Sequence, residues 1–292
     1  MKRSEFGAYT ICSLLFIVLF VSVLCFAFAE HEQWNCPECG RTGNTGNYCG
    51  GCAHPAPWIE VEKNEDTESA QRDMSAFRIV SSIVAFGHYE QDDNTDNGAE
   101  TIEWIVLDYD KTKNRTLLLS QYGLDTKPYN SMQTNITWEN SSLRKWLNEE
   151  FLNTAFTAEE QSAILITYVD NSMSQGCWNT DGGNNTTDKI FLLSFKEANR
   201  YLGVTTNDSN DTRTRVQPTA YAISQGAATS TQYKTSSGMA AGWWWLRSPG
   251  DKPYFAAHVQ DSGLLGRDNV FMVHPNSVVR PAFWLNLESD IF

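Results

Sequence analysis

The sequence predicts an α+β domain with an antiparallel sheet over residues 77–292. Two observations support this prediction. Short segments at both ends of this region alternate apolar and polar residues, which is the pattern of half-buried strands. Between them lie segments whose apolar residues recur at helical spacing, followed by a long stretch of loop-forming residues. Because strands and helices are segregated along the chain, we expect the N- and C-terminal strands to meet in one antiparallel sheet.

The first half of the domain begins with strands. Three alternating segments are predicted to form them: IVAFGHYEQ, TIEWIVLDYD and RTLLLSQYG. Residues 140–153 are then predicted to form a helix that Ser141 or its neighbour can cap. Its apolar residues at helical spacing are Leu143, Trp146, Leu147 and Phe151.

Two capping boxes predict two further helices. In a capping box a Ser or Thr side chain and a Glu three residues later satisfy each other's backbone N–H groups. Thr157 and Glu160 predict a helix that ends near Ile166. Ser194 and Glu197 predict another that ends at Leu202.

Residues 204–240 are rich in Thr, Ser, Asn and Gly, so we expect a long loop there. Short strands are expected after it, around residues 243–246, 254–260, 270–274 and 278–285. The first of these contains three consecutive tryptophans, and a strand cannot bury all three on one face because successive side chains point to opposite sides. We expect Trp244 and one neighbour to be core residues, and Arg247 to be a structural charge paired with a carboxylate or carbonyl groups.

The first 29 residues predict export. Lys2 and Arg3 precede an uncharged apolar run from Ile11 to Ala29 that ends in Ala-Phe-Ala. This order is typical of a secretory signal peptide, although the run is also close to the length of a membrane-spanning helix. Under either reading the rest of the chain is extracytoplasmic, secreted or anchored to the cell membrane by this segment.

Four cysteines follow within residues 30–56. They form two Cys-x-x-Cys pairs, and two such pairs can complete a tetrahedral four-sulfur site, so a zinc ribbon with structural zinc is expected. Two disulfides are the alternative, because an exported chain meets an oxidising environment. The ligands are Cys36, Cys39, Cys49 and Cys52. An acidic linker over residues 57–76 connects this segment to the main domain.

The formal net charge of −13 argues against a nucleic-acid partner and against docking on anionic lipid. Contact with a membrane is expected only through the N-terminal segment, if it is not cleaved. The loop DDNTDNG supplies clustered oxygen ligands of the kind that calcium prefers. A calcium site at Asp92, Asp93 and Asp96 is therefore one hypothesis, and a solvated hairpin turn is the other.

Several segments together resemble a known family. They include FGHYEQD, LLLSQYGLDTKPYN, TWENSSLRKWLNEEFLNTAFTAEEQSAI, WWWLRSPG and VRPAFWLNL, and they span nearly all of residues 80–287. This pattern resembles an uncharacterised family of bacterial extracytoplasmic domains common in Firmicutes, whose members often carry a zinc ribbon and a membrane segment. Its ending also resembles the C-type-lectin-like fold of formylglycine-generating enzymes and of retroelement variable proteins. The resemblance implies a C-type-lectin-like domain with two to three helices at residues 77–292.

In the variable proteins the corresponding C-terminal segment contacts the ligand, so the resemblance implies a binding face on residues 251–274. Its candidate residues are Tyr254, His258, Gln260, Arg267, Asp268 and Asn269. An ordinary solvated hairpin is the competing interpretation of the same segment.

Three functional hypotheses follow. The preferred one is a non-catalytic surface module that binds an unknown protein or glycan. The rival is an enzyme on a formylglycine-generating-enzyme-like fold, but that chemistry needs two reactive cysteines and the main domain has only Cys177. The third is a purely structural or assembly role in which the zinc ribbon makes the contact with a partner.

Overall fold

The computed structural model describes residues 73–207, 212–266 and 273–292, together with residues 33, 35, 37, 41 and 42. The chain divides at Ala70, and the domain described below belongs to its second unit, Gln71–Phe292. The predicted signal or anchor segment, the four cysteines and most other residues of the zinc ribbon, and most of the acidic linker lie outside the described residues.

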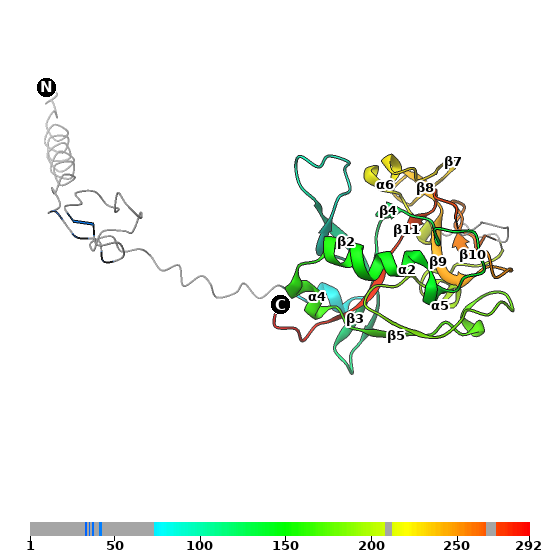
Figure 1. Ribbon diagram of the computed structural model, residues 1–292, viewed down its shortest axis with the longest axis horizontal. Coiled ribbons are helices and arrows are strands. Elements are labelled where there is room, and N and C mark those ends of the chain that lie inside the picture. The colour runs from blue at the N-terminus through cyan, green and yellow to red at the C-terminus, as the bar shows by residue number, and fades with distance from the viewer. Residues whose placement is uncertain are drawn as a thin grey trace, which may run out of the picture. The chain divides into compact units, whose positions relative to one another are not determined.

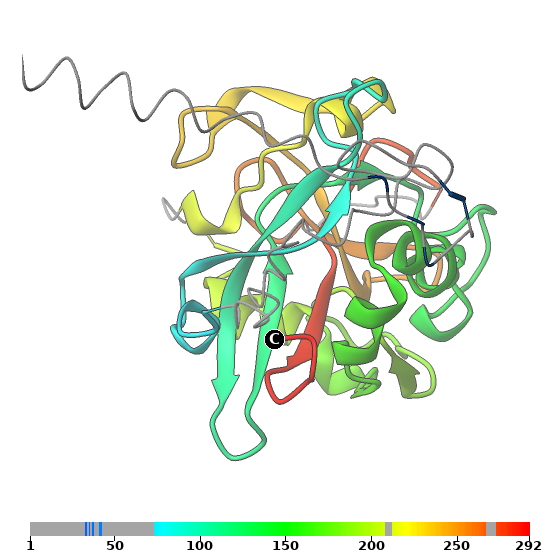
Figure 2. The same ribbon diagram turned by 90° about the vertical axis from the view of Figure 1, so that its left-hand side faces the viewer.

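The domain is α+β with mostly antiparallel sheets, as the sequence predicts (Figure 1). The first sheet has the strand order β1-β2-β3-β12 and is antiparallel throughout. Its strands are β1 (Ile83–Tyr89), β2 (Glu100–Asp110), β3 (Arg115–Ser120) and β12 (Ala282–Asn286). Figure 2 shows β12, in red, beside β3, so the two ends of the domain do meet in one sheet.

The second sheet has the order β10-β9-β11-β4 and occupies the other half of the domain in Figure 1. Its strands are β4 (Asp125–Thr126), β9 (Trp244–Pro249), β10 (Ala256–Val259) and β11 (Val278–Val279). All its pairs are antiparallel except that of β11 with β9. Two small hairpin sheets complete the strands: β5 (Thr167–Val169) with β6 (Thr186–Asp188), and β7 (Thr229–Lys234) with β8 (Ala240–Gly242).

The helices are short. One continuous helical segment consists of α2 (Ser142–Trp146), a π-helical turn η3 (Leu147–Phe151) and α3 (Leu152–Ala155). Three others follow: α4 (Ala158–Ala163), α5 (Phe195–Leu202) and α6 (Ala220–Ser224). Single 3-10 turns complete the list: η1 (Ala76–Arg78), η2 (Trp138–Asn140), η4 (Met173–Gln175) and η5 (Thr212–Thr214).

The predicted helix starts are confirmed. Ser141 caps α2 by accepting a hydrogen bond from the Arg144 N–H. Both capping boxes form, at the starts of α4 and α5. Helix α5 ends at Leu202, and the following Gly203 adopts the left-handed conformation with φ of 77°, which glycine tolerates without steric cost.

Three of the predicted boundaries are wrong. The helix expected to end near Ile166 ends at Ala163. The expected loop at residues 204–240 contains α6 and β7, and Thr219 begins α6 by accepting a hydrogen bond from the Ala222 N–H. The expected strand at residues 278–285 is split into β11 and β12. Pro281 lies at the break, where it cannot donate a backbone hydrogen bond to a neighbouring strand. Most of the expected strand at residues 270–274 lies outside the described part of the chain.

An aromatic cluster joins the first sheet to the helices. Trp104 on β2 and Phe283 on β12 have ring centroids 4.7 Å apart in an edge-to-face contact. Phe156, between α3 and α4, lies 5.5 Å from Phe283 and 5.5 Å from Phe86 of β1. The buried Trp104 indole donates a hydrogen bond to the Phe86 carbonyl at 2.7 Å. Each such buried side chain contributes about 1.5–3 kcal/mol, so this cluster holds the sheet and helices in fixed relation.

Candidate functional site

Two of the three tryptophans are core residues at the start of β9, and the third, Trp243, directly precedes this strand. Trp244 and Trp245 are buried, and Trp243 is half-buried. Trp243 and Trp245 lie on the same face, where the His258 ring is stacked 5.2 Å from the first and lies edge-on 6.3 Å from the second. On the other face the Arg280 guanidinium lies 5.1 Å from the Trp244 ring. The prediction that Trp244 and one neighbour are core is therefore confirmed.

Arg247, next along the same strand, is a structural charge as expected. Its guanidinium donates two hydrogen bonds to the Glu197 carboxylate and further bonds to the Leu192 and Asp170 carbonyls and the Asn171 side chain. Burial alone would raise the pKa of Glu197, but the Arg247 charge and hydrogen bonds from Ser194 hold it below its usual value. Every one of these contacts ties β9 to a neighbouring segment, so Arg247 stabilises the fold.

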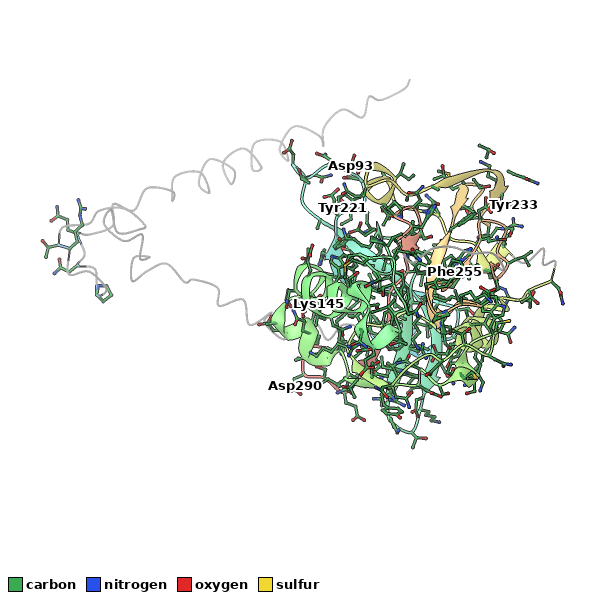
Figure 3. The ribbon with its side chains drawn as sticks, turned by 45° about the vertical axis from the view of Figure 1, so that its right-hand side comes forward. Asp93, Lys145, Tyr221, Tyr233, Phe255 and Asp290 are labelled. Carbon is green, nitrogen blue, oxygen red and sulfur yellow. The ribbon has the colours of Figure 1, made fainter. Side chains whose placement is uncertain are left out.

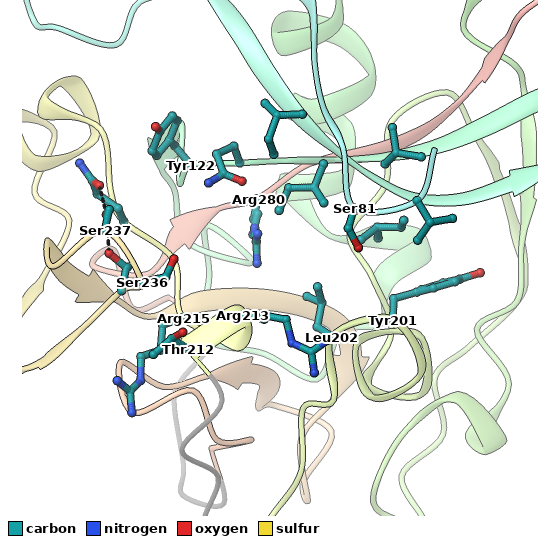
Figure 4. Close-up of a pocket in the computed structure, with 18 residues that line it drawn as sticks. Ser81, Tyr122, Tyr201, Leu202, Thr212, Arg213, Arg215, Ser236, Ser237 and Arg280 are labelled. Atoms are coloured by element: carbon teal, nitrogen blue, oxygen red, sulfur yellow. Dashed lines mark hydrogen bonds between the residues drawn. The ribbon is translucent and has the colours of Figure 1, made fainter. Parts of the chain in front are cut away.

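A cavity of about 260 Å³ lies beside the first sheet. Its walls come from separate segments: the middle of β2, the residues after β3, the end of α5, the η5 turn and the β7–β8 turn. Figure 4 shows these segments around one space, with Arg280 reaching into it. The polar side chains in its lining are Ser81, Gln121, Tyr122, Tyr201, Thr212, Arg213, Arg215, Gln217, Thr235, Ser236, Ser237 and Arg280. Among the described residues, no carboxylate, imidazole or thiol lines this cavity.

Arg280 is the buried polar residue among the lining residues. Only 1% of its surface is exposed, because it lies between β11 and β12 at the break made by Pro281. Its Nε donates a hydrogen bond to the Ser120 carbonyl at 2.9 Å, and its Nη1 has no hydrogen-bond partner in the described chain. Burial lowers the pKa of Arg280 to about 9, so the side chain remains charged at neutral pH.

The other arginines of the lining differ from Arg280. Arg215 links separate segments of the chain. Its Nε and Nη1 donate hydrogen bonds to the carbonyls of Ser262 and Lys234, and its guanidinium lies 5.3 Å from the Tyr233 ring. Arg213, on η5, is exposed. In Figure 4 it lies across the space from Arg280.

Two tyrosines at this cavity remain neutral at pH 7. Burial and the neighbouring Glu103 raise the pKa of Tyr122. Burial and the Asp108 carboxylate, whose Oδ2 accepts a hydrogen bond from the Tyr201 hydroxyl with an O···O distance of 3.1 Å, raise the pKa of Tyr201 to about 12. Both rings therefore offer an apolar face with an uncharged hydroxyl.

The binding face expected from the resemblance is only partly described. Tyr254 is 36% exposed, and Gln260 is half-buried. His258 is buried between tryptophans, so its imidazole does not belong to an exposed face. Arg267, Asp268 and Asn269 lie outside the described residues. Tyr254 and Gln260 are not part of the cavity beside the first sheet.

The acidic loop brings together a different set of oxygens from the predicted one. Carboxylate oxygens of Glu90, Asp92 and Glu100 lie within 4.8 Å of one another. Asp93 instead accepts a hydrogen bond from the Ser224 hydroxyl at 2.7 Å, and Figure 3 shows it near Tyr221 of α6. Backbone N–H groups of the loop already donate to this acidic set, as a solvated turn requires. Calcium binding at Asp92, Asp93 and Asp96 stays a prediction.

The remaining candidate reactive residues are cysteines. Cys177 is exposed, and Cys36, Cys39, Cys49 and Cys52 lie outside the described residues. None of the helices in the described chain is both long and apolar enough to cross a membrane.

Sequence reasoning did not assign a role to the cavity residues. Arg280 lies in the segment VRPAFWLNL, where a charged residue interrupts an apolar run directly before a proline. That interruption is the available signal, because a buried charge needs a partner. The arrangement of the other walls depends on contacts between distant segments, which local patterns do not encode.

Comparison with known proteins gives one match. The family model described as "Domain of unknown function (DUF6273)" matches residues 113–287. No curated protein and no solved structure matches the chain. Because the matched region covers more than half of the sequence, and contains all four strands of the second sheet, the chain belongs to this family of domains of unknown function, DUF6273.

Proposed function

We propose that this chain is a non-catalytic binding module at the bacterial cell surface, and that the cavity beside the first sheet is its ligand site. The ligand is a surface protein or glycan. The observation that carries this proposal is the lining of the cavity, which combines two neutral tyrosines, hydroxyl and amide side chains and arginines. Aromatic faces and fixed hydrogen-bonding groups in a concave site are the usual means of binding a polar ligand.

The lining also favours binding over catalysis. General acid–base and nucleophilic chemistry needs a carboxylate, imidazole, thiol or activated hydroxyl at the reacting centre. The described lining supplies arginines and neutral polar groups, which hold a ligand in position. For this reason we place the enzyme hypothesis second.

The wider organisation is part of the same proposal. We infer a C-type-lectin-like domain at residues 77–292, supported by the WWWLRSPG and VRPAFWLNL segments and by the mixed, mostly antiparallel architecture. We infer a zinc ribbon at residues 30–56 and a signal peptide or anchor at residues 1–29, supported by the cysteine spacing and the apolar run. Together these parts give a secreted or membrane-tethered module.

The test is a binding screen of the purified chain on arrays of glycans and bacterial surface proteins. Tyr122→Ala changes the cavity, and Tyr254→Ala changes the C-terminal segment outside it. We expect reproducible binding that Tyr122→Ala abolishes and Tyr254→Ala retains. The opposite pattern would assign binding to residues 251–274. A folded chain that binds nothing on either array contradicts the proposed function.

The zinc ribbon has its own test. Metal analysis of the reduced full-length chain should find about one zinc per chain, because four thiolates fill one structural site. Cys39→Ser should release that zinc, whereas Cys177→Ser, the matched control in the main domain, should retain it. A chain whose four N-terminal cysteines are oxidised and which carries no zinc would establish the disulfide alternative.

A further inference from the structure

The lining of the cavity is positively charged in a chain that is strongly acidic overall. It includes Arg213, Arg215 and Arg280 and no described carboxylate, whereas the whole chain has a formal net charge of −13. Two acidic side chains next to the lining already have partners: Asp108 accepts from the Tyr201 hydroxyl and pairs with Arg200 at 3.6 Å, and Glu103 interacts with the Tyr122 hydroxyl. A concave site lined by one sign of charge raises the local concentration of ligands of the opposite sign.

Arg280 makes this charge available to a ligand. A buried guanidinium normally has a carboxylate partner, as Arg247 has Glu197 in the same domain. Arg280 has no such carboxylate among the described residues: its Nε donates to one carbonyl and its face lies against Trp244. Its Nη1 has no partner there, and the side chain reaches into the cavity (Figure 4). A buried charged donor with no partner is costly, and an anion that accepts from it removes that cost.

We propose that the cavity binds an oxyanion group of the ligand, that is, a carboxylate, sulfate or phosphate, through the Nη1 donor of Arg280. Arg213 on the opposite wall supplies a second positive charge, and the Ser236 and Ser237 hydroxyls lie at the same space. The volume of about 260 Å³ suits one sugar ring or a group of similar size. This inference rests on the proposed function, and an acidic sugar is the ligand class that satisfies both.

The test uses the full-length chain and four probes: sodium glucuronate, sodium sulfate, inorganic phosphate and neutral glucose. Calorimetric titration and thermal unfolding are measured for each probe, with sodium chloride added to match ionic strength. We expect at least one of the three anions to bind and to raise Tm more than sodium chloride does. The anion that binds most tightly identifies the group.

Three variants assign the binding to the cavity. Arg280→Gln should weaken anion binding at least about tenfold, since a hydrogen bond to a charged group is lost. Arg200→Gln, on α5, removes the same charge from a side chain that is 70% exposed and lies outside the lining, so it should leave binding within about twofold. If Arg280→Gln does not fold, Arg213→Gln tests the site in its place. Arg213 is exposed, so this variant should fold, and it should bind the anion several-fold more weakly than the wild type.

The inference is overturned if none of the anions binds better than glucose or chloride, or if Arg200→Gln weakens binding as much as the cavity variant does. Its failure differs from failure of the proposed function. A neutral array ligand whose binding Tyr122→Ala abolishes would leave the function standing and overturn the oxyanion site. If the chain binds an anion through Arg280 but binds nothing on the arrays, the oxyanion site stands and the proposed function is overturned.

Discussion

Arg247 and Arg280 are both buried arginines from signature segments of this domain, and their surroundings differ. Arg247 is surrounded by the Glu197 carboxylate and by carbonyl and amide oxygens from three other residues. Within the described part of the chain, the Arg280 guanidinium interacts with one carbonyl and one tryptophan ring. The sequence predicted the structural role of Arg247, because an arginine inside a buried strand requires a partner. It could not predict Glu197 as that partner, because the two residues are brought together only by the tertiary fold.

Glu197→Gln tests the charge of this ion pair. Glutamine still completes the capping box of α5, so the substitution removes the charge and keeps the helix start. We expect the free energy of unfolding at pH 7 to fall by about 3 kcal/mol, because Arg247 loses its counterion while it stays buried. Urea unfolding measures this, with the exposed Glu159→Gln as the control. Equal losses for the two variants would contradict the assigned role.

The same pair predicts a pH dependence. The folded state holds the pKa of Glu197 below the ordinary value of 4.5, so the unfolded chain binds more protons as the pH falls. The stabilisation is complete above that value and is lost as the pH falls through the lower, folded-state pKa. Unfolding curves at descending pH should therefore show the wild type and Glu197→Gln converging in acid. A difference that stays constant down to the acid transition would exclude this linkage.

At the scale of elements, the helix starts were predictable and the strand irregularities were not. A capping box is a local pattern, so Thr157 and Ser194 predicted the starts of α4 and α5 from the sequence. The bulge in β1 has a weaker signal, a single glycine inside the strand pattern, which does not say what approaches it. The register between β1 and β2 shifts between Ala85 and His88, where Gly87 adopts a positive φ of 70°. A Cβ at this position would meet the Phe156 ring at 2.5 Å, so the close approach of a residue far along the chain requires the glycine.

Gly87→Ala should therefore lower the free energy of unfolding more than an ordinary glycine-to-alanine substitution does. Both the strained φ and the contact with Phe156 oppose the methyl group, so we expect a loss of about 3 kcal/mol in the free energy of unfolding. Gly98→Ala is the matched control, because its φ of 84° imposes the same kind of strain while nothing lies within 4 Å of its Cβ. We expect about 1 kcal/mol there. Similar losses at both positions would show that Phe156 moves aside readily.

Asn148, in the π-helical turn η3, links this helix to the segment after β6. Its Oδ1 accepts from the Lys189 and Ile190 N–H groups at 2.9 and 3.1 Å, and its Nδ2 donates to the Ile190 carbonyl at 2.8 Å. Asn148→Ala leaves these backbone groups without partners and should destabilise the domain by about 2–4 kcal/mol. Asn153→Ala, on an exposed position of α3, should cost under about 1 kcal/mol. Thermal unfolding compares the two, and an unchanged Tm for Asn148→Ala would contradict the link.

At the scale of the whole molecule, the sequence predicted the fold class, and the tertiary fold determines the candidate site. Alternation and helical spacing sufficed for an α+β domain whose terminal strands share a sheet. The cavity has walls from residues as distant as Ser81 and Arg280, and no local pattern joins them. The binding residues expected around Tyr254 rest on a resemblance by segment, and the expected calcium ligands rest on local polarity. Neither of these signals encodes a concave site.

The extent of the family match leads to the last prediction. The matched region, residues 113–287, begins in the turn between β2 and β3 and so excludes β1 and β2. In the structure β3 pairs with β2 along one edge and with β12 along the other, and Trp104 on β2 packs against Phe283 on β12. A fragment of residues 113–287 would leave β3 unpaired on one side, with its buried leucines Leu117, Leu118 and Leu119 uncovered.

We therefore expect the 113–287 fragment to lack cooperative unfolding in urea and dispersed amide signals in its NMR spectrum. The 71–292 fragment, which keeps all four strands of the first sheet, should unfold cooperatively because the core described above is complete within it. It should also keep the cavity, whose walls on the β2 side come from residues before 113. If instead the 113–287 fragment unfolds cooperatively at the same urea concentration as 71–292, the first two strands are an accessory to the family domain and not part of its folding unit.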